Sequence, residues 1–482
     1  MNTTSNLESP AKADAVGTNR WYLASAPIVR VLVHLCVPMA AAMIVGAVYN
    51  VINAGFIGSL HDTALLAAVT SESPVLGLVM AVGGVFSTGG GALISPLLGA
   101  SENEPAKASE IKHVSSFAMW GSVIVGAVFG AAGLFLLHPL VSLLGANTAA
   151  VPATRAFVGV MLAFVPVLAA AFCLEQLVRA EGAARQVMTG LIASTVANLV
   201  FDVAFILVLR WGVAGAALSM GLANLGVVIY FAVWLQQHSE HLSVSPRWFT
   251  LSPAVLKPVF GVGVGELLQS AFLIVTSLVL NNLAANYGDG PLAAMGVAVR
   301  IAQVPEFLVM GVTLGVLPLL AYSYGKGDKT RLASALRAFA STVGGVTLLF
   351  SVVVFVFRHQ VFSAFVSDPS FLALGATIIT AQLVSMIFNG FAGLITSLFQ
   401  ATGRALPATV LSTTQGILFI PIVLLGNLWF GLSGIIWSLT VSEGAVLVIG
   451  IIMALASRGV IGRGLAEGSP ARADEVLEQV EA

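Results

Sequence analysis

The sequence predicts an all-α integral membrane protein with twelve transmembrane helices. Of its 482 residues, 58% are hydrophobic and only 9% are charged, which is too little charge to cover the surface of a soluble domain of this length. The net charge of -1 provides no basic field for nucleic acid. Cys36 and Cys173 both lie inside apolar runs, so we interpret them as small buried hydrophobic residues.

Twelve apolar runs are each long enough to cross a bilayer. They cover approximately residues 30–58, 63–97, 113–137, 154–178, 186–209, 212–235, 253–283, 291–322, 331–357, 370–400, 405–428 and 430–457. With twelve spans, the only basic residues in loops on one side are Arg155, Arg210 and Arg358, while the loops on the other side carry many. The positive-inside rule therefore predicts that both termini are cytoplasmic.

Short motifs recur about 220 residues apart, which predicts a duplication of six spans. The paired motifs are Arg210-Trp211-Gly212-Val213-Ala214-Gly215 with Trp429-Phe430-Gly431-Leu432-Ser433-Gly434, Arg179-Ala180-Glu181-Gly182 with Gln400-Ala401-Thr402-Gly403, and Gly99-Ala100-Ser101-Glu102 with Gly325-Lys326-Gly327-Asp328. Because each half has an even number of spans, we expect two six-helix lobes related by a parallel pseudo-twofold axis along the membrane normal.

This repeat divides the chain into five expected parts. They are a cytoplasmic N-terminal tail at 1–29, an N-lobe at 30–235, a cytoplasmic inter-lobe linker at 236–252, a C-lobe at 253–457 and a cytoplasmic C-terminal tail at 458–482.

Several motifs, in this order along nearly the whole chain, resemble the multidrug and toxic compound extrusion (MATE) family. They include Tyr49-Asn50-Val51-Ile52-Asn53-Ala54-Gly55, Gly89-Gly90-Gly91-Ala92-Leu93-Ile94-Ser95, Arg179-Ala180-Glu181-Gly182, Asn198-Leu199-Val200-Phe201-Asp202 and Ala298-Val299-Arg300-Ile301. The pattern is most similar to the DinF-like and MepA-like branches. The resemblance implies a MATE-like antiporter that exports organic, often cationic compounds in exchange for protons or sodium ions by alternating access.

The same resemblance sets the expectations for cofactors, partners and location. We expect no cofactor beyond the coupling H+ or Na+, small organic molecules and membrane lipid as partners, no nucleic acid, and a functional monomer. The expected location is the cytoplasmic membrane of a bacterium or archaeon.

Asp202 is the leading candidate for cation or proton coupling in the N-lobe. Asn198 precedes it by one helical turn and Thr195 lies near the same stripe. An ionised carboxylate facing lipid would be costly, so Asp202 should face other helices. Because an intramembrane acid with an Asn at this spacing resembles the amino-lobe cation site of the family, a functional role is favoured over a protonated carboxyl that only joins helices. Family members usually carry Asp at the position of Asn53, so here Asn53 and Asn50 are expected as neutral partners. A sodium ion would be held by Asp202, Asn198 and Asn53.

A second polar cluster is expected in the C-lobe. Glu266 lies deep in the seventh run, and Arg300, Gln303 and Glu306 share one sector of the eighth. Arg300 pairing with Glu306 or Glu266 as a structural ion pair is weighed equally against direct handling of substrate or protons. The polar residues toward the cytoplasmic end of the fourth run have exposed charge and interhelical pairing as their default interpretation; they are Glu175, Gln176, Arg179 and Glu181.

Three other functions are weighed against multidrug efflux. A dedicated exporter of one secreted metabolite would have the same sequence features, and a flippase for lipid-linked saccharides would suit the repeat but favours a more basic cavity. A membrane enzyme is disfavoured, because the sequence has neither a His-Glu-x-x-His metal motif nor a phosphate-binding loop.

Overall fold

The computed structural model describes residues 16–59, 72–143, 151–287, 289–358, 360 and 369–467, and within these it forms helices and loops only. The twelve long helices are α2 (Ile28–Ser59), α4 (Glu72–Ser101), α5 (Lys107–Phe135), α7 (Val151–Ala180), α8 (Ala184–Asp202), α9 (Gly212–His238), α10 (Pro253–Ala285), α11 (Asp289–Gly325), α12 (Lys329–Val356), α14 (Pro369–Ala401), α15 (Ala405–Phe430) and α16 (Leu432–Ala456). The shorter elements are α1 (Asn19–Ala24), α6 (Leu137–Leu143), the π-helix η1 (Val203–Val208), the 3-10 turn η2 (Pro246–Trp248) and α17 (Arg458–Glu467).

Each long helix coincides with one predicted apolar run to within about seven residues, and the largest of these differences is the end of α8 at Asp202, after which η1 continues the run to Val208. The exception is the predicted start of the second run at 63, which lies outside the described residues. Within the described residues, ten helices are long and apolar enough to cross a membrane, and only 17% to 61% of their most apolar windows is buried inside the protein. The remaining apolar surface requires a lipid environment.

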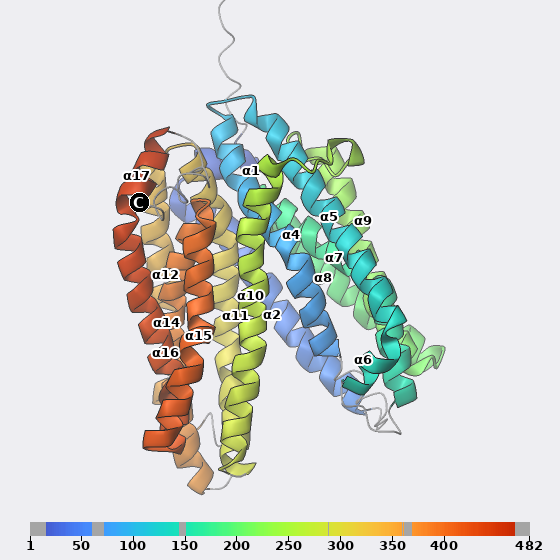
Figure 1. Cartoon of the computed structure of the whole chain (residues 1–482), viewed down its shortest axis with the longest axis vertical. Coiled ribbons are helices and arrows are strands. Elements are labelled where there is room, and N and C mark those ends of the chain that lie inside the picture. Colours follow the sequence, from blue (N-terminus) through green and yellow to red (C-terminus); the bar gives the residue numbers. More distant parts are fainter. Residues whose placement is uncertain are drawn as a thin grey trace, which may run out of the picture.

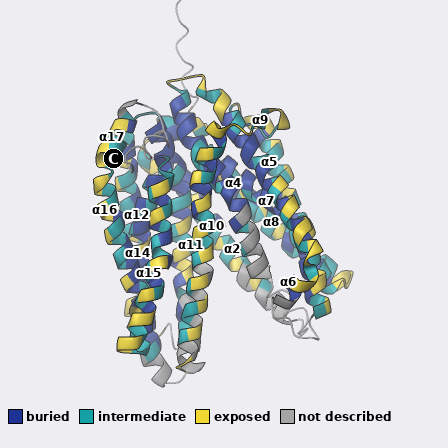
Figure 2. Cartoon of the chain, in the orientation of Figure 1, coloured by how far each residue is buried: buried dark blue, intermediate teal, exposed yellow. Residues whose placement is uncertain are grey.

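The long helices form two bundles of six (Figure 1). One bundle contains α2, α4, α5, α7, α8 and α9, and the other contains α10, α11, α12, α14, α15 and α16. The bundles converge at the end that carries α1 and α17 and diverge toward the end that carries α6. Buried side chains are concentrated where the bundles converge, as Figure 2 shows. The arrangement confirms the predicted fold class of twelve helices in two six-helix lobes.

The seam between the bundles is built on glycines that allow one backbone to lie directly against another. A Cβ atom added to Gly89 would overlap the backbone of Val259, and one added to Gly263 would overlap the backbone of Val85. The backbones of α4 and α10 are therefore in direct contact at these glycines. On the other side of the seam, a Cβ at Gly311 would overlap the backbone of Ala40, so α11 and α2 are in direct backbone contact there. The two halves of the repeat therefore contribute corresponding contacts to the seam, as a pseudo-twofold axis requires.

The turns from α7 to α8 and from α14 to α15 show the same repeat in their backbone conformation. Gly182 has φ +84° and Gly403 has φ +69°, a left-handed conformation in which glycine commonly ends a helix. These are the two glycines that the second pair of sequence motifs aligns. The repeated motif thus marks a repeated helix stop.

Glu181 lies in the first of these turns, outside the membrane-spanning helices. Burial raises the pKa of its carboxyl to about 7, with a hydrogen bond from Ser239 opposing the shift and the charge of Glu240 adding to it. The unfolded chain loses this proton near pH 4.5, so the free energy of unfolding should fall as pH rises from about 4.5 to 7 and then level off.

Replacing Glu181 with Gln should remove this part of the pH dependence, which amounts to about 2 kcal/mol. The measurement is the thermal unfolding midpoint in detergent at pH 5 and pH 7.5. Glu240→Gln, at the neighbouring exposed carboxyl, should retain most of the dependence. An equal pH dependence in Glu181→Gln and the parent protein would contradict the assignment.

Candidate functional site

A cavity of about 510 Å³ lies between the two bundles. Helices of both bundles line it, with a largely apolar wall that includes Met43, Met80, Phe172, Met310 and Leu314. Its charged lining residues are Glu175 and Arg179 from α7 and Glu266 from α10. Apolar walls with a few charged groups are typical of sites for amphiphilic small molecules.

Arg179 is the centre of the polar group in this cavity. Its guanidinium Nη1 lies 3.4 Å from Glu175 Oε1, and its Nη2 donates to the side-chain oxygen of Gln176. The side chain of Arg179 is only 6% exposed and that of Glu175 is 14% exposed. Of the two expectations for this helix end, exposed charge is wrong for Glu175 and Arg179, because the end of α7 faces the seam between the bundles. Interhelical pairing agrees with the electrostatic interaction between Arg179 and Glu266 of α10.

Glu266 approaches the same group from the other bundle. Its side chain passes over Gly84 of α4, where an added Cβ would lie 3.2 Å from Glu266 Cγ. It also interacts electrostatically with Arg179. One carboxylate from each bundle therefore interacts with this guanidinium, Glu175 through an ion pair and Glu266 through its charge. When all three groups are ionised, they carry a net negative charge.

A second polar cluster lies inside the N-terminal bundle. Asp202 ends α8, directly before η1, and is 3% exposed. Ser219 of α9 donates a hydrogen bond to Asp202 Oδ1. When the Asn198 amide is oriented to satisfy its neighbours, its nitrogen donates to Asp202 Oδ2 over 2.8 Å and its oxygen accepts from the backbone N–H of Met220 over 3.1 Å. Both carboxylate oxygens thus have a donor.

Tyr49 brings α2 into this cluster. Its hydroxyl is hydrogen-bonded to the side-chain amide of Asn198. The cluster consequently joins α2, α8 and α9. The π-helix that begins at Val203, immediately after Asp202, is a backbone irregularity that frequently occurs at functional sites.

The other predicted N-lobe residues have no described hydrogen bond to Asp202. The Thr195 hydroxyl donates to the backbone oxygen of Leu191 in its own helix, over 2.9 Å. Asn53 Oδ1 is buried and has no hydrogen-bond partner among the described residues, so it is a free acceptor. The side chain of Asn50 lies outside the described residues.

Among the predicted C-lobe residues whose side chains the structure describes, Glu266 is the one that lines the cavity. Gln303 and Glu306 are exposed on α11 and are absent from the described lining. The side chain of Arg300 lies outside the described residues, so its pairing stays a prediction. Glu443, 2% exposed on α16, accepts a hydrogen bond from Gln415 of α15 and so joins two helices.

Tyr49 and Ser219 of the Asp202 cluster, and the role of Glu175 and Arg179 in the cavity, were not predicted from the sequence. Ser219 follows the repeated motif that ends at Gly215 by four residues, but the motif does not indicate that the Ser219 hydroxyl reaches Asp202. No group of three or more His, Cys, Asp and Glu side chains that could hold a metal ion occurs within the described residues. A coupling sodium ion would therefore have to use amide, hydroxyl and single carboxylate oxygens.

Comparison with known proteins identifies the family. The MatE family model matches residues 38–204 and 264–425. The chain is 30% identical over 423 residues to the multidrug export protein MepA of Staphylococcus aureus strain MRSA252, covering 88% of this chain and 92% of that protein. It is 31% identical to MepA of Staphylococcus saprophyticus over the same shares of both chains.

Solved structures of MATE transporters have the same fold. A crystal structure of MATE in complex with MaL6 matches with a TM-score of 0.82 at 21% identity, over 92% of this chain and 99% of that chain. An outward-facing multidrug resistance MATE transporter of the MOP superfamily matches with a TM-score of 0.83 at 20% identity, over 93% of this chain and all of the other. On the family match and the nearly full-length relatives, the chain belongs to the MatE family of multi-pass membrane transporters.

Proposed function

We propose that this transporter exports lipophilic organic cations in exchange for protons or sodium ions, by alternating access, and that it is a transporter without enzymatic activity. The observation that carries the proposal is the inter-bundle cavity, with its apolar wall and with Glu175 and Glu266 sharing Arg179. A lipophilic cation gains apolar burial from such a wall and charge compensation from the acids. The multidrug export function of the MepA relatives supports the same substrate class.

Coupling would occur at the Asp202 cluster. Ser219 and Asn198 donate to its two oxygens, and these hydrogen bonds hold the carboxyl group in one position from which it can bind a cation. Asn53 adds a buried acceptor that has no hydrogen-bond partner in the described part of the chain, which suits a sodium ion held by Asp202, Asn198 and Asn53. A proton would be taken up by Asp202 alone, since amides do not titrate.

The basic residues support an orientation in which α1 and α17 lie on the cytoplasmic side of a bacterial or archaeal membrane. In that orientation, the bundles are closed toward the cytoplasm and diverge toward the outside. The cavity would then be in its releasing state, and binding of the coupling cation would bias the bundles toward expulsion of the substrate. We expect each monomer to perform the whole cycle.

The proposal is tested by drug accumulation in an efflux-deficient host. Expression of the chain should lower the accumulation of lipophilic cations more than that of matched neutral and anionic compounds. Sodium dependence at fixed pH would identify Na+ as the coupling ion, and pH dependence without sodium would identify H+. Equal accumulation of all compounds with and without the chain would refute the proposed substrate class.

A further inference from the structure

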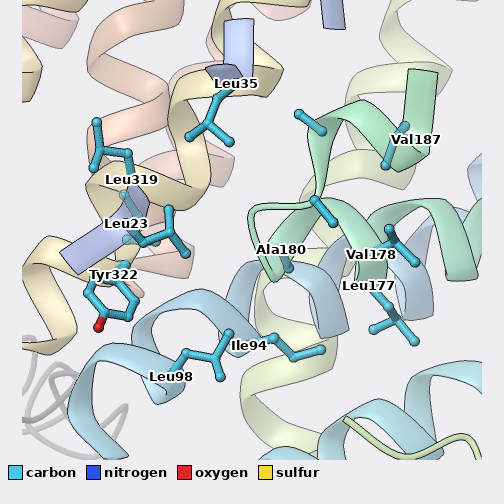
Figure 3. Close-up of a cluster of buried hydrophobic side chains, with 14 of the residues drawn as sticks. Leu23, Leu35, Ile94, Leu98, Leu177, Val178, Ala180, Val187, Leu319 and Tyr322 are labelled. Atoms are coloured by element: carbon cyan, nitrogen blue, oxygen red, sulfur yellow. The ribbon is translucent and has the colours of Figure 1, made fainter. Parts of the chain in front are cut away.

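The short helix α1 lies across the end where the two bundles converge, and it contacts both of them (Figure 1). Its Leu23 is 1% exposed and lies against Gly182 of the α7–α8 turn, where an added Cβ would be 3.1 Å from Leu23 Cδ1. Figure 3 shows Leu23 beside Leu319 and Tyr322 of α11, in the same buried cluster as Leu98 of α4. The hydrophobic side of α1 therefore fills the seam between the bundles.

Arg331, on α12 of the C-terminal bundle, donates two hydrogen bonds to the last turn of α1 and a third to Ala26, between α1 and α2. Its Nε donates to Leu23 O over 2.7 Å, its Nη2 to Tyr22 O over 2.8 Å and its Nη1 to Ala26 O over 3.0 Å. The final carbonyls of a helix lack partners within the helix and carry partial negative charge. A guanidinium satisfies them well, because its donors are arranged as a rigid fork and its charge is permanent.

Glu102, in the loop after α4, forms a second connection between the bundles. Its Oε2 lies 2.6 Å from Lys326 Nζ, and its Oε1 accepts from the Tyr322 hydroxyl and lies 3.4 Å from Arg20 Nε of α1. Burial raises the pKa of this carboxyl, but the hydrogen bonds from Lys326 and Tyr322 and the charges of Lys326 and Arg20 outweigh it and leave the pKa below its usual value. The carboxylate is therefore ionised at neutral pH.

The two loops that meet here are the third pair of repeated sequence motifs. A Cβ at Gly99 would overlap the backbone oxygen of Tyr322, and a Cβ at Gly325 would overlap that of Pro96. Asn103 Nδ2 also donates to Lys326 O over 3.2 Å. The two copies of this repeated motif are thus in direct contact with each other at the end where the bundles converge.

From these contacts we propose that α1 is a latch: Arg331 and the Glu102–Lys326 pair hold the bundles closed at this end, and both connections break when the cavity opens to the cytoplasm. The inference rests on the alternating access and orientation proposed above. Only three residues separate the end of α1 at Ala24 from the start of α2 at Ile28, so α1 should move with the N-terminal bundle. Separating the bundles must then break the hydrogen bonds from Arg331, which lies in the other bundle. Arg331 and Glu102 are thus positioning residues for the transport cycle, remote from the substrate.

The test measures the cavity's accessibility from each side of the membrane. A single reporter, Ala92→Cys in the cavity wall, is placed in a background with Cys36→Ala and Cys173→Ala, and labelled by a membrane-impermeant maleimide in inside-out and right-side-out vesicles. Arg331→Ala should raise the cytoplasmic labelling rate about tenfold and lower the external rate, because one state gains population at the expense of the other. Arg337→Ala, at an exposed arginine of the same helix, is the matched control.

The charge pair gives a second, milder test. Glu102→Lys and Lys326→Glu should each raise cytoplasmic labelling, and the double variant should restore part of the parent's low rate. The latch would be overturned if Arg331→Ala and Arg337→Ala had the same labelling rates as each other on each side of the membrane. It would also be overturned if the double variant had a cytoplasmic labelling rate as high as that of either single variant. A simultaneous rise from both sides in Arg331→Ala would indicate loss of packing and would also count against it.

The two proposals can fail separately. Cation export measured in the same membranes, with labelling unaffected by Arg331→Ala, would overturn the latch and leave the proposed function standing. Reciprocal labelling changes in a protein that exports no organic cation would support the latch and refute the proposed substrate class.

Discussion

Replacing Asp202 with Asn is expected to abolish ion-coupled transport, with drug-driven ion flux in proteoliposomes falling on the order of 100-fold. The reason is that the substitution removes the carboxylate of the N-terminal polar cluster while preserving its shape. Asn can still accept from Ser219 and interact with Asn198, so the fold should survive. What is lost is the charge that attracts sodium or carries the proton.

Thr195→Ala is the matched control on the same helix. Among the described contacts, the Thr195 hydroxyl donates only to the backbone carbonyl of Leu191 in the same helix. Because this is a local hydrogen bond, its removal should change the ion flux less than about threefold. Coupling at the parent level in Asp202→Asn would refute the assignment of this residue. A loss in Thr195→Ala as large as that in Asp202→Asn would argue that general disturbance of α8 is the cause.

Glu266→Gln is expected to weaken binding of lipophilic cations about tenfold while leaving neutral compounds of similar shape nearly unchanged. Glu266 lines the cavity and shares Arg179 with Glu175. Removing one of the two acids leaves Arg179 balanced by a single carboxylate, so the cavity loses its net negative charge. The measurement is the Kd for a fluorescent cation and for its neutral analogue, with purified protein in detergent.

Glu306→Gln provides a control at an acid on α11 that is exposed and absent from the described cavity lining. Its Kd values should stay within about twofold of the parent protein. The account of the cavity would be contradicted if Glu306→Gln lowered cation affinity more than Glu266→Gln. It would also be contradicted if Glu266→Gln weakened the binding of the cation and of its neutral analogue equally. Equal weakening would indicate that the shape of the cavity had changed and that its recognition of charge had not.

The fold was predictable because lipid imposes simple demands on a chain. Each apolar run must satisfy its backbone hydrogen bonds internally, so its length alone defines a helix. The same repeated glycines that the sequence aligns, Gly182 and Gly403, end α7 and α14 with left-handed conformations. The seam glycines and the short elements were harder to foresee, because which backbones meet depends on how the bundles pack.

The candidate site was predictable in part. Asp202 and Asn198 are one turn apart on one helix, so their proximity follows from helix geometry and the structure brings them together. Tyr49 and Ser219 come from other helices, and these helices are apolar around most of their circumference, so no periodic pattern indicates which face meets α8. The same ambiguity placed Arg179 at an exposed helix end, whereas it is buried at the seam.

Arg331 shows a different limit of sequence interpretation. By its position it is one of many basic residues that fix orientation, yet its guanidinium binds three carbonyl oxygens of a segment about 300 positions earlier. The six-residue helix that it holds is too short to be recognised from propensity. Hydrogen bonds from a side chain to a backbone segment so far away in the sequence leave no local sequence pattern by which they could be predicted.

If cation entry drives export, an inward ion gradient should be sufficient to expel a substrate from a sealed vesicle. Proteoliposomes are loaded with a fluorescent organic cation, and dye release is followed while inward proton and sodium gradients are imposed one at a time. The account predicts release under one of these gradients, its arrest when that gradient is collapsed, and uptake of the same ion driven by the dye alone. Dye release at the full rate in the absence of both gradients would contradict it.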